Sequence, residues 1–213
     1  MYNTNIKALL FDMDGVTIDS EKLYSKTEPY ILKKYGINFN KEDWSLIKGC
    51  TEKQFYDHVF KKFNPKIDRD SLIKESKDFL KKIFSQELVY MNGFKQLHDK
   101  YREKYKFILV TSTGPELMNH IDKVLSIRKM FDFTFDSSDT DKHKPDPEPY
   151  LNAINKLGLA SSECVVIEDS IQGVSSGKAA GCFVVALLGT LDKKLLREAD
   201  MLISSLHELS KIL

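Results

Sequence analysis

Two aspartates, Asp12 and Asp14, close a short apolar run near the start of the chain and are followed by Gly15. In extended backbone, residues two apart point to the same side and lie about 6.5 Å apart. That spacing leaves room for a small reacting group, which one carboxylate could attack while the other moves protons. The alternative is an ordinary Asp-Gly turn. The apolar run before the pair and the polar partners farther along the chain favour the catalytic interpretation.

A second acidic pair, Glu168 and Asp169, ends another apolar run. Adjacent buried carboxylates repel each other and lose hydration, and a divalent cation would relieve both costs. Oxygen ligands without a nearby His or Cys favour Mg²⁺ over zinc. Asp169 or Ser170 could also cap the helix that follows, and this role is compatible with metal binding.

Lys144 lies between these acidic pairs in the sequence, beside Pro145 in a proline-rich segment that would fix its position. It could neutralise an anionic substrate and keep a nucleophile ionised, or it could form a surface ion pair of little energetic weight. Thr111 and Ser112 follow another apolar run. Their hydroxyl and backbone N–H groups could hold phosphate oxygens, although such residues also occur at ordinary strand ends.

The elements that position these residues can be predicted from hydrophobic patterning. Continuous apolar runs predict strands that are buried on both faces of a parallel sheet, at residues 6–11, 107–111, 133–135, 164–167, 183–187 and 201–203. Helical patterns lie between the later runs. We therefore expect an α/β fold with a doubly wound, mainly parallel sheet. In such a sheet, ligands bind outside the carboxyl ends of the strands, where all the candidate residues above fall.

Residues 20–88 differ from the rest, because they contain helical patterns and no convincing strand. Helices are expected at 21–35, 51–63 and 72–84, and glycine or proline follows the first two. We expect residues 1–18 and 89–213 to form an α/β core domain and residues 19–88 to form an inserted α-helical cap domain.

These motifs resemble, in order and spacing, the four motifs of the haloacid dehalogenase-like (HAD) hydrolase superfamily. The residues that carry the resemblance are the segment 12–20, Thr111, Lys144-Pro145 and Glu168-Asp169. The helical insertion resembles the small cap of the sugar-phosphate phosphatases and β-phosphoglucomutase-like proteins. The resemblance implies a Rossmann-like core and hydrolysis of a phosphate ester.

The resemblance also implies the role of each residue. Asp12 would attack phosphorus and form an aspartyl-phosphate, and Asp14 would protonate the leaving alcohol and then activate water. Thr111 and Lys144 would hold phosphoryl oxygens. Mg²⁺ would be held by the Asp12 carboxylate, the Asp14 backbone carbonyl and Asp169, with Glu168 close by or acting through water.

An aspartate at position 14 suits an alkoxide leaving group, which must be protonated, and therefore a phosphate monoester. The mutase-like pattern has a cap histidine and a cap arginine where this chain has Tyr24 and Glu52. A mutase binds a second phosphate, which an acidic residue opposes. We therefore expect a phosphatase for a sugar, polyol or nucleoside monophosphate. The alternatives are a phosphomutase and a non-catalytic binding module.

The cap should set the choice of substrate and exclude water when closed. The candidates for contact with the substrate are Ser20, Glu21, Tyr24, Lys48 and Glu52.

Composition limits the remaining possibilities. The 213 residues carry 32 Lys plus Arg and 31 Asp plus Glu, a net charge of +1 that indicates neither a nucleic-acid nor a membrane partner. The 3 cysteines lie far apart, which indicates a reducing compartment. With no expected signal peptide or membrane span, we expect a cytoplasmic monomer that acts on a small phosphorylated metabolite.

Overall fold

The strands form where the sequence has its apolar runs. They are β1 (Ala8–Phe11), β2 (Lys106–Val110), β3 (Phe133–Phe135), β4 (Cys164–Glu168), β5 (Phe183–Leu187) and β6 (Met201–Ile203). The computed structural model describes residues 5–47 and 50–213. Within these residues the strands form one six-stranded parallel sheet, in the order β3-β2-β1-β4-β5-β6. The expected α/β fold with a parallel sheet is confirmed.

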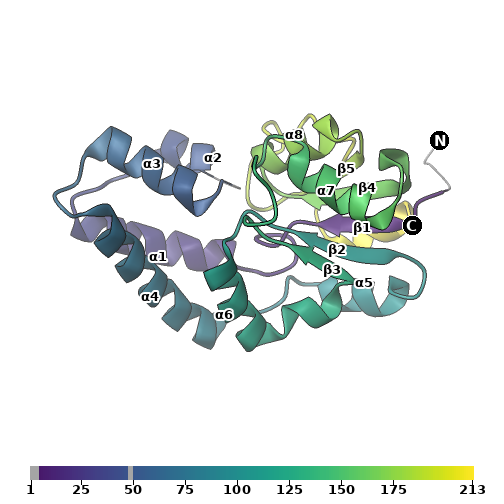
Figure 1. Ribbon diagram of the computed structural model, residues 1–213, viewed down its shortest axis with the longest axis horizontal. Helices are drawn as coiled ribbons and strands as arrows, with labels where there is room; N and C mark the ends of the chain where they lie inside the picture. The colour runs from purple at the N-terminus through teal and green to yellow at the C-terminus, as the bar shows by residue number, and fades with distance from the viewer. Residues whose placement is uncertain (1–4, 48–49) are drawn as a thin grey trace.

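Helices cover both faces of the sheet (Figure 1). On one face, Leu9 and Phe11 of β1 pack in a core with α5 (Phe94–Tyr101), α6 (Pro115–Leu125) and the 3-10 helix η3 (Leu206–Lys211). On the other, Ala8 and Leu10 join a core with α7 (Glu148–Leu157) and α8 (Ile171–Ala179). Because successive strand residues point to opposite faces, a continuously apolar strand supplies both cores.

The chain between β1 and β2 forms the expected helical insertion before it reaches α5. Its helices are α1 (Glu21–Lys34), α2 (Lys41–Ile47), α3 (Glu52–Phe63) and α4 (Arg69–Glu87). They enclose a small core of their own, which includes Ile31, Tyr56, Val59 and Leu72. We call this insertion, residues 19–88, the cap. Figure 1 shows it beside the sheet, connected to the core by two segments.

The two connecting segments run side by side. Ile18 bridges to Tyr90, the Asp19 N–H donates to Val89 O at 3.0 Å, and the Met91 N–H donates to Thr17 O at 2.9 Å. These backbone contacts lie at the predicted boundary between cap and core, and α4 of the cap also packs against α6 of the core. The domain division itself stays a prediction.

Local signals explain most of the helix ends. Thr51 and Gln54 form a capping box at the start of α3, and Asn64 ends that helix with a left-handed φ of 43°. The helices α2 and α5 were not expected. The short helix α2 begins where Asn40 and Asp43 hydrogen-bond reciprocally, at 2.9 and 3.0 Å, so a local capping interaction compensates for its length.

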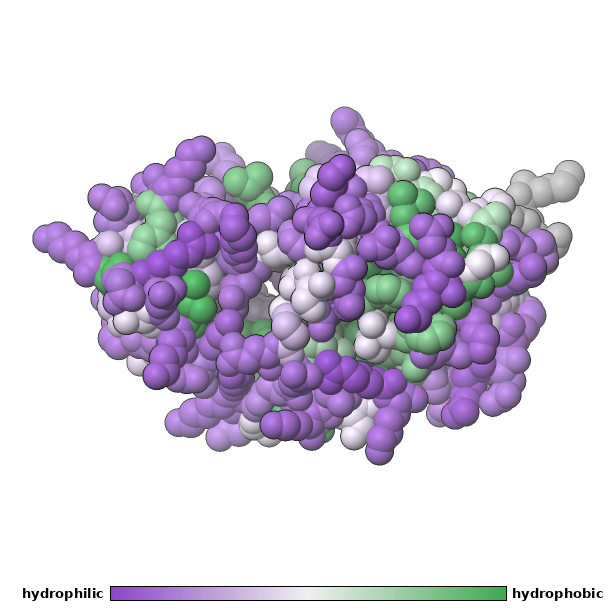
Figure 2. All heavy atoms as spheres, viewed as in Figure 1, coloured by the Kyte–Doolittle hydropathy of each residue, from purple (hydrophilic) through white to green (hydrophobic). Residues whose placement is uncertain are grey.

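Hydrophilic residues cover most of the face in Figure 2, and hydrophobic atoms show there only in small areas. Among the helices that the structure describes, none combines the length and the apolar character that a membrane crossing requires.

Candidate active site

The residues predicted to take part in the chemistry lie together at the carboxyl ends of neighbouring strands. Asp12 directly follows β1, Thr111 directly follows β2, and Glu168 is the last residue of β4. Because β1 lies between β2 and β4 in the sheet, these three strand ends are adjacent. The chain order of the sheet reverses at β1 and β4, which is where open α/β sheets bind their ligands.

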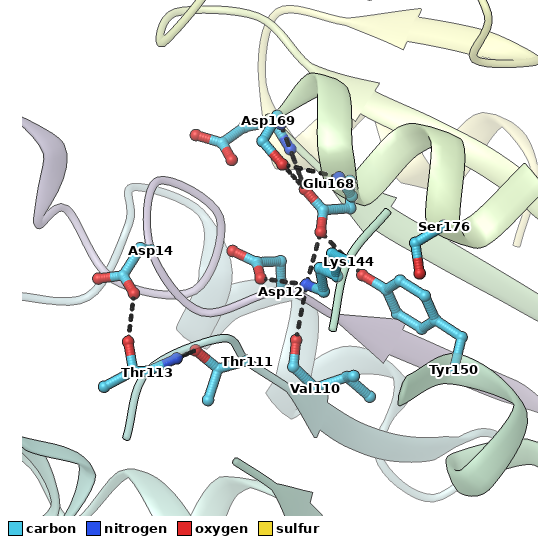
Figure 3. Close-up of polar contacts among 12 residues, drawn as sticks. Asp12, Asp14, Val110, Thr111, Thr113, Lys144, Tyr150, Glu168, Asp169 and Ser176 are labelled. Carbon is cyan, nitrogen blue, oxygen red and sulfur yellow. Dashed lines mark hydrogen bonds and ion pairs between the residues drawn. The ribbon is translucent and has the colours of Figure 1, made fainter. Parts of the chain in front are cut away.

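Lys144 lies at the centre of this group (Figure 3). Its Nζ atom is 2.6 Å from Asp12 Oδ1, 2.7 Å from Glu168 Oε1 and 3.0 Å from Val110 O. Lys144 is 2% exposed and Glu168 is fully buried. An ammonium group has three N–H donors, so these contacts use all of them. Lys144, which the sequence predicts to be a site residue, is therefore held between Asp12 and Glu168, which belong to the two acidic pairs that flank it in the sequence.

Burial and the neighbouring Glu168 carboxylate raise the pKa of Asp12. Burial alone would also raise the pKa of Glu168, but the charge and hydrogen bond of Lys144 hold it below its usual value. Burial would lower the pKa of Lys144, and the charges of Asp12 and Glu168 outweigh this effect and raise it. One ammonium therefore serves two buried carboxylates, and the excess of negative charge favours a further cation at this site.

Both oxygens of Glu168 are occupied by protein donors. Oε1 accepts from Lys144 and, at 2.9 Å, from the Tyr150 hydroxyl. Oε2 accepts from the backbone N–H groups of Asp169 and Ser170 and from the Ser170 hydroxyl, at 3.0 to 3.2 Å. Gly173 on α8 permits this packing, because a Cβ there would overlap the Glu168 carboxylate. Glu168 is therefore a fixed anchor for Lys144.

Three carboxylates could hold a metal ion. One oxygen each from Asp12, Glu168 and Asp169 lie within 4.8 Å of one another. Asp169 is buried and accepts a short hydrogen bond from the Thr190 hydroxyl. A cluster of oxygen donors is the chemistry that hard divalent cations prefer. The sequence prediction of an acidic pair at this edge is consistent with the geometry.

Asp14 lies beside the acidic cluster, and two hydroxyl groups orient it. The Ser20 hydroxyl donates to Oδ1 at 2.6 Å, and the Thr113 hydroxyl donates to Oδ2 at 2.9 Å. Gly15, with a φ of 74°, makes the tight turn after the pair, and a Cβ there would overlap Asp169. The Asp-Gly turn is therefore present, and it lies beside the acidic cluster.

Thr111 is buried and Ser112 is half-buried, and both line the cavity above the strand ends. The Thr111 hydroxyl accepts from the Thr113 N–H at 3.1 Å. The loop after β2 thereby presents hydroxyl groups opposite Asp12 and Asp14 (Figure 3), as expected of residues that could hold phosphate oxygens.

The cavity lies between the cap and the carboxyl ends of the strands and has a volume of about 660 Å³. Of the predicted cap contacts, Glu21, Tyr24 and Glu52 line it. Ser20 does not line the cavity, because it is buried against Asp14. Lys48 lies outside the described residues.

Other residues at the site were not among the predicted ones, namely Thr113, Tyr150, Thr190 and Glu28. Two of them carry a usable signal in the sequence. Thr113 follows the predicted pair at the end of β2, and Glu28 lies one helical turn after Tyr24 on the same face of α1. Tyr150 and Thr190 reach the site only through the packing of distant segments.

The family model of the haloacid dehalogenase-like hydrolases matches residues 9–187. The chain belongs to this family. The matched segment contains the carboxyl ends of β1, β2 and β4. The expected family is therefore confirmed, and the phosphatase relatives described next also confirm the expected enzyme class, an HAD-like phosphatase.

Two relatives with curated names are phosphatases. The Phosphorylated carbohydrates phosphatase of Thermotoga maritima is 29% identical over 83% of this chain and 82% of its own length. The Validoxylamine A 7'-phosphate phosphatase of Streptomyces hygroscopicus is 28% identical over 95% of each. The crystal structure of CbbY from Rhodobacter sphaeroides in complex with phosphate superposes with a TM-score of 0.82 at 20% identity, over 96% of each chain. That likeness supports the fold alone.

Proposed function

We propose that this HAD-like hydrolase is a Mg²⁺-dependent phosphatase for a small phosphate monoester, and that Asp12 carries an aspartyl-phosphate intermediate. The observation that carries the proposal is the position of Asp12. Its carboxylate lies at a strand end, is ion-paired with Lys144, and faces a cavity that also contains Asp14. This arrangement supplies a nucleophile and a proton carrier.

In the first step, an oxygen of the Asp12 carboxylate attacks phosphorus and the bond from phosphorus to the ester oxygen breaks. Asp14 donates a proton to the departing alkoxide. In the second step, Asp14 takes a proton from water, the water oxygen attacks phosphorus, and the bond to Asp12 breaks to release inorganic phosphate. The hydrogen bonds from Ser20 and Thr113 hold the Asp14 carboxyl group in place for both proton transfers.

The residues present suit Mg²⁺, because all the available donors are oxygens. Asp12, Asp169 and the Asp14 backbone carbonyl would hold the ion. Glu168 would act from farther away, since both of its oxygens already accept hydrogen bonds. When bound, the ion would neutralise the negative charge on the nucleophile and on the phosphoryl group. Thr111 and Ser112 would hold phosphoryl oxygens, and Lys144 would add positive charge beneath them.

The expected substrates are sugar, polyol or nucleoside monophosphates. The curated relative whose name specifies phosphorylated carbohydrates supports the sugar side of this range. The main alternative, a phosphomutase, requires a site for a second phosphate. Glu52 lies in the cavity wall and its carboxylate pairs with Lys77 at 2.9 Å. This ion pair neutralises a lysine that could otherwise bind the second phosphate, so it opposes a phosphomutase.

The test is phosphate release from p-nitrophenyl phosphate and from a panel of sugar, polyol and nucleoside monophosphates, with Mg²⁺ or with EDTA. We expect turnover that requires Mg²⁺ and that Asp12→Asn abolishes. A phosphorus-31 spectrum after incubation with a hexose 1-phosphate distinguishes the alternative, because a mutase would give a new sugar phosphate in place of inorganic phosphate. Absence of turnover on every substrate by a folded protein that binds Mg²⁺ would refute the proposal.

A further inference from the structure

The cap side of the cavity is strongly acidic. Glu21, Glu28 and Glu52 line it, and they face a floor that already contains carboxylates. The lysines that line the cavity in the described part of the chain are both in ion pairs. Lys77 lies between Glu52 and Glu116, at 2.9 and 3.0 Å, and the largely exposed Lys53 pairs with Asp57 at 3.0 Å.

Glu28 has the most distinctive position in this wall. It is half-buried on α1, and within the described residues it makes no hydrogen bond or ion pair. Burial, and then the charge of Asp14, raise its pKa to about 8. The charge of Glu28 in turn contributes to the raised pKa values of Tyr24 and Cys50. Glu28 is therefore coupled electrostatically to Asp14 on the floor of the cavity and to Tyr24 and Cys50 on its cap side.

A carboxyl group in this position selects among leaving groups. It can accept hydrogen bonds from hydroxyl groups when ionised, and can also donate one when protonated. Above its pKa of about 8 Glu28 is ionised, and a second phosphate or a carboxylate on the substrate would then face like charge in a partly desolvated site, which disfavours binding. Aromatic side chains such as Tyr24, Trp44 and Tyr56 line the same cavity and add apolar surface against which a carbon chain can pack.

We infer that Glu28 is the specificity-determining residue of the proposed phosphatase, where it binds the hydroxyl groups of an uncharged sugar or polyol and rejects leaving groups with a second anionic group. The inference rests on the proposed function and narrows its substrate class. It predicts discrimination between two monophosphates that differ only in charge at the far end of the carbon chain.

Glucitol 6-phosphate and 6-phosphogluconate form such a pair, because one carries a hydroxymethyl group where the other carries a carboxylate. At about pH 9, where Glu28 is ionised, we expect the wild-type enzyme to prefer glucitol 6-phosphate in kcat/KM by at least about tenfold, which corresponds to about 1.4 kcal/mol. Glu28→Gln preserves the shape of the side chain and removes its charge. It should reduce the preference about tenfold, chiefly by lowering KM for 6-phosphogluconate and raising KM for glucitol 6-phosphate.

Glu42→Gln is the matched control, because Glu42 is an exposed cap carboxylate that does not line the cavity. It should leave the preference unchanged. If Glu28→Gln does not fold, as judged by circular dichroism, Glu28→Asp replaces it. That variant keeps the charge on a shorter side chain, so it should retain the rejection of 6-phosphogluconate while KM for glucitol 6-phosphate rises.

Turnover of p-nitrophenyl phosphate separates the two hypotheses. If the wild type hydrolyses it but shows no preference within the pair, or if Glu28→Gln leaves the preference unchanged, the inference about Glu28 is wrong and the phosphatase proposal stands. If the wild type hydrolyses no monoester at all, both are wrong.

Discussion

Replacing Lys144 with methionine should destabilise the protein severely. Methionine keeps most of the volume of the side chain, so the packing over the Tyr150 ring, 5.0 Å from Nζ, is largely preserved. The charge is lost, and the buried Asp12 and Glu168 carboxylates are left facing each other without a cation.

Removing one partner from a buried ion pair typically costs about 3–5 kcal/mol, because the remaining charge stays desolvated. Here one lysine serves two carboxylates at 2.6 and 2.7 Å, and we expect Lys144→Met to reach the upper part of that range. The cost should shrink as pH falls, since protonation of the carboxylates relieves the unneutralised charge. In the wild type, the lowered pKa of Glu168 contributes stability that is lost in acid, whereas the raised pKa of Asp12 contributes stability that is lost as pH rises.

The assay is urea unfolding in EDTA at about pH 7.5 and about pH 5. Lys142→Met is the control, because Lys142 is exposed and only 3.7 Å from its partner Asp146; it should change the free energy of unfolding by less than about 0.5 kcal/mol. Adding Glu168→Gln to Lys144→Met should recover about 1–2 kcal/mol by removing one of the stranded charges. A loss below about 1 kcal/mol for Lys144→Met would show that the cluster is not a buried charge centre.

Three further variants test other parts of the structure. The pKa of Glu28 is raised to about 8 from a usual 4.5, so the free energy of unfolding of the wild type declines as pH rises between these values. In thermal unfolding with EDTA, Glu28→Gln should therefore be more stable than the wild type by about 1–3 kcal/mol at pH 8 and equally stable at pH 4.5. Thr113→Val removes one of the donors that orient Asp14 and should lower kcat about tenfold in the phosphate-release assay, while the melting temperature changes little. Gly173→Ala forces a Cβ into the Glu168 carboxylate. It should lower the free energy of unfolding in urea by at least about 2 kcal/mol, although alanine is the better helix former. An unchanged free energy of unfolding would mean that α8 can shift away from the sheet.

The core fold could be predicted because parallel strands buried on both faces have a simple signature. Each apolar run became a strand, with ends within one or two residues of the predicted ones. The helices α2 and α5 were missed because each is short, with 7 and 8 residues, and hydrophobic periodicity needs a longer window. Packing and caps decide such elements, as the Asn40–Asp43 pair does for α2.

The candidate site was predictable in part for a topological reason. The motifs follow strand ends, and parallel strands bring their carboxyl ends to one edge, so sequence order alone gathers Asp12, Thr111 and Glu168. Contacts made across the layers have no such signature. Tyr150 has the pattern of a buried apolar helix residue, and its hydrogen bond to Glu168 depends on how α7 packs on the sheet. The electrostatic environment of Glu28 likewise exists only once the cap covers the strand ends.

The adjacent pair Glu168-Asp169 shows where a sequence pattern needs strand geometry to be interpreted. Two neighbouring carboxylates suggest one shared role, but consecutive residues in extended chain point to opposite sides. Accordingly, Glu168 turns toward Lys144 and Tyr150, whereas Asp169 lies against the turn at Gly15 and bonds Thr190. The geometry therefore favours two different tasks, an anchor for Lys144 and the proposed metal ligand beside Asp12. Because successive side chains in extended chain point to opposite sides, one dipeptide can supply both the anchor and the ligand.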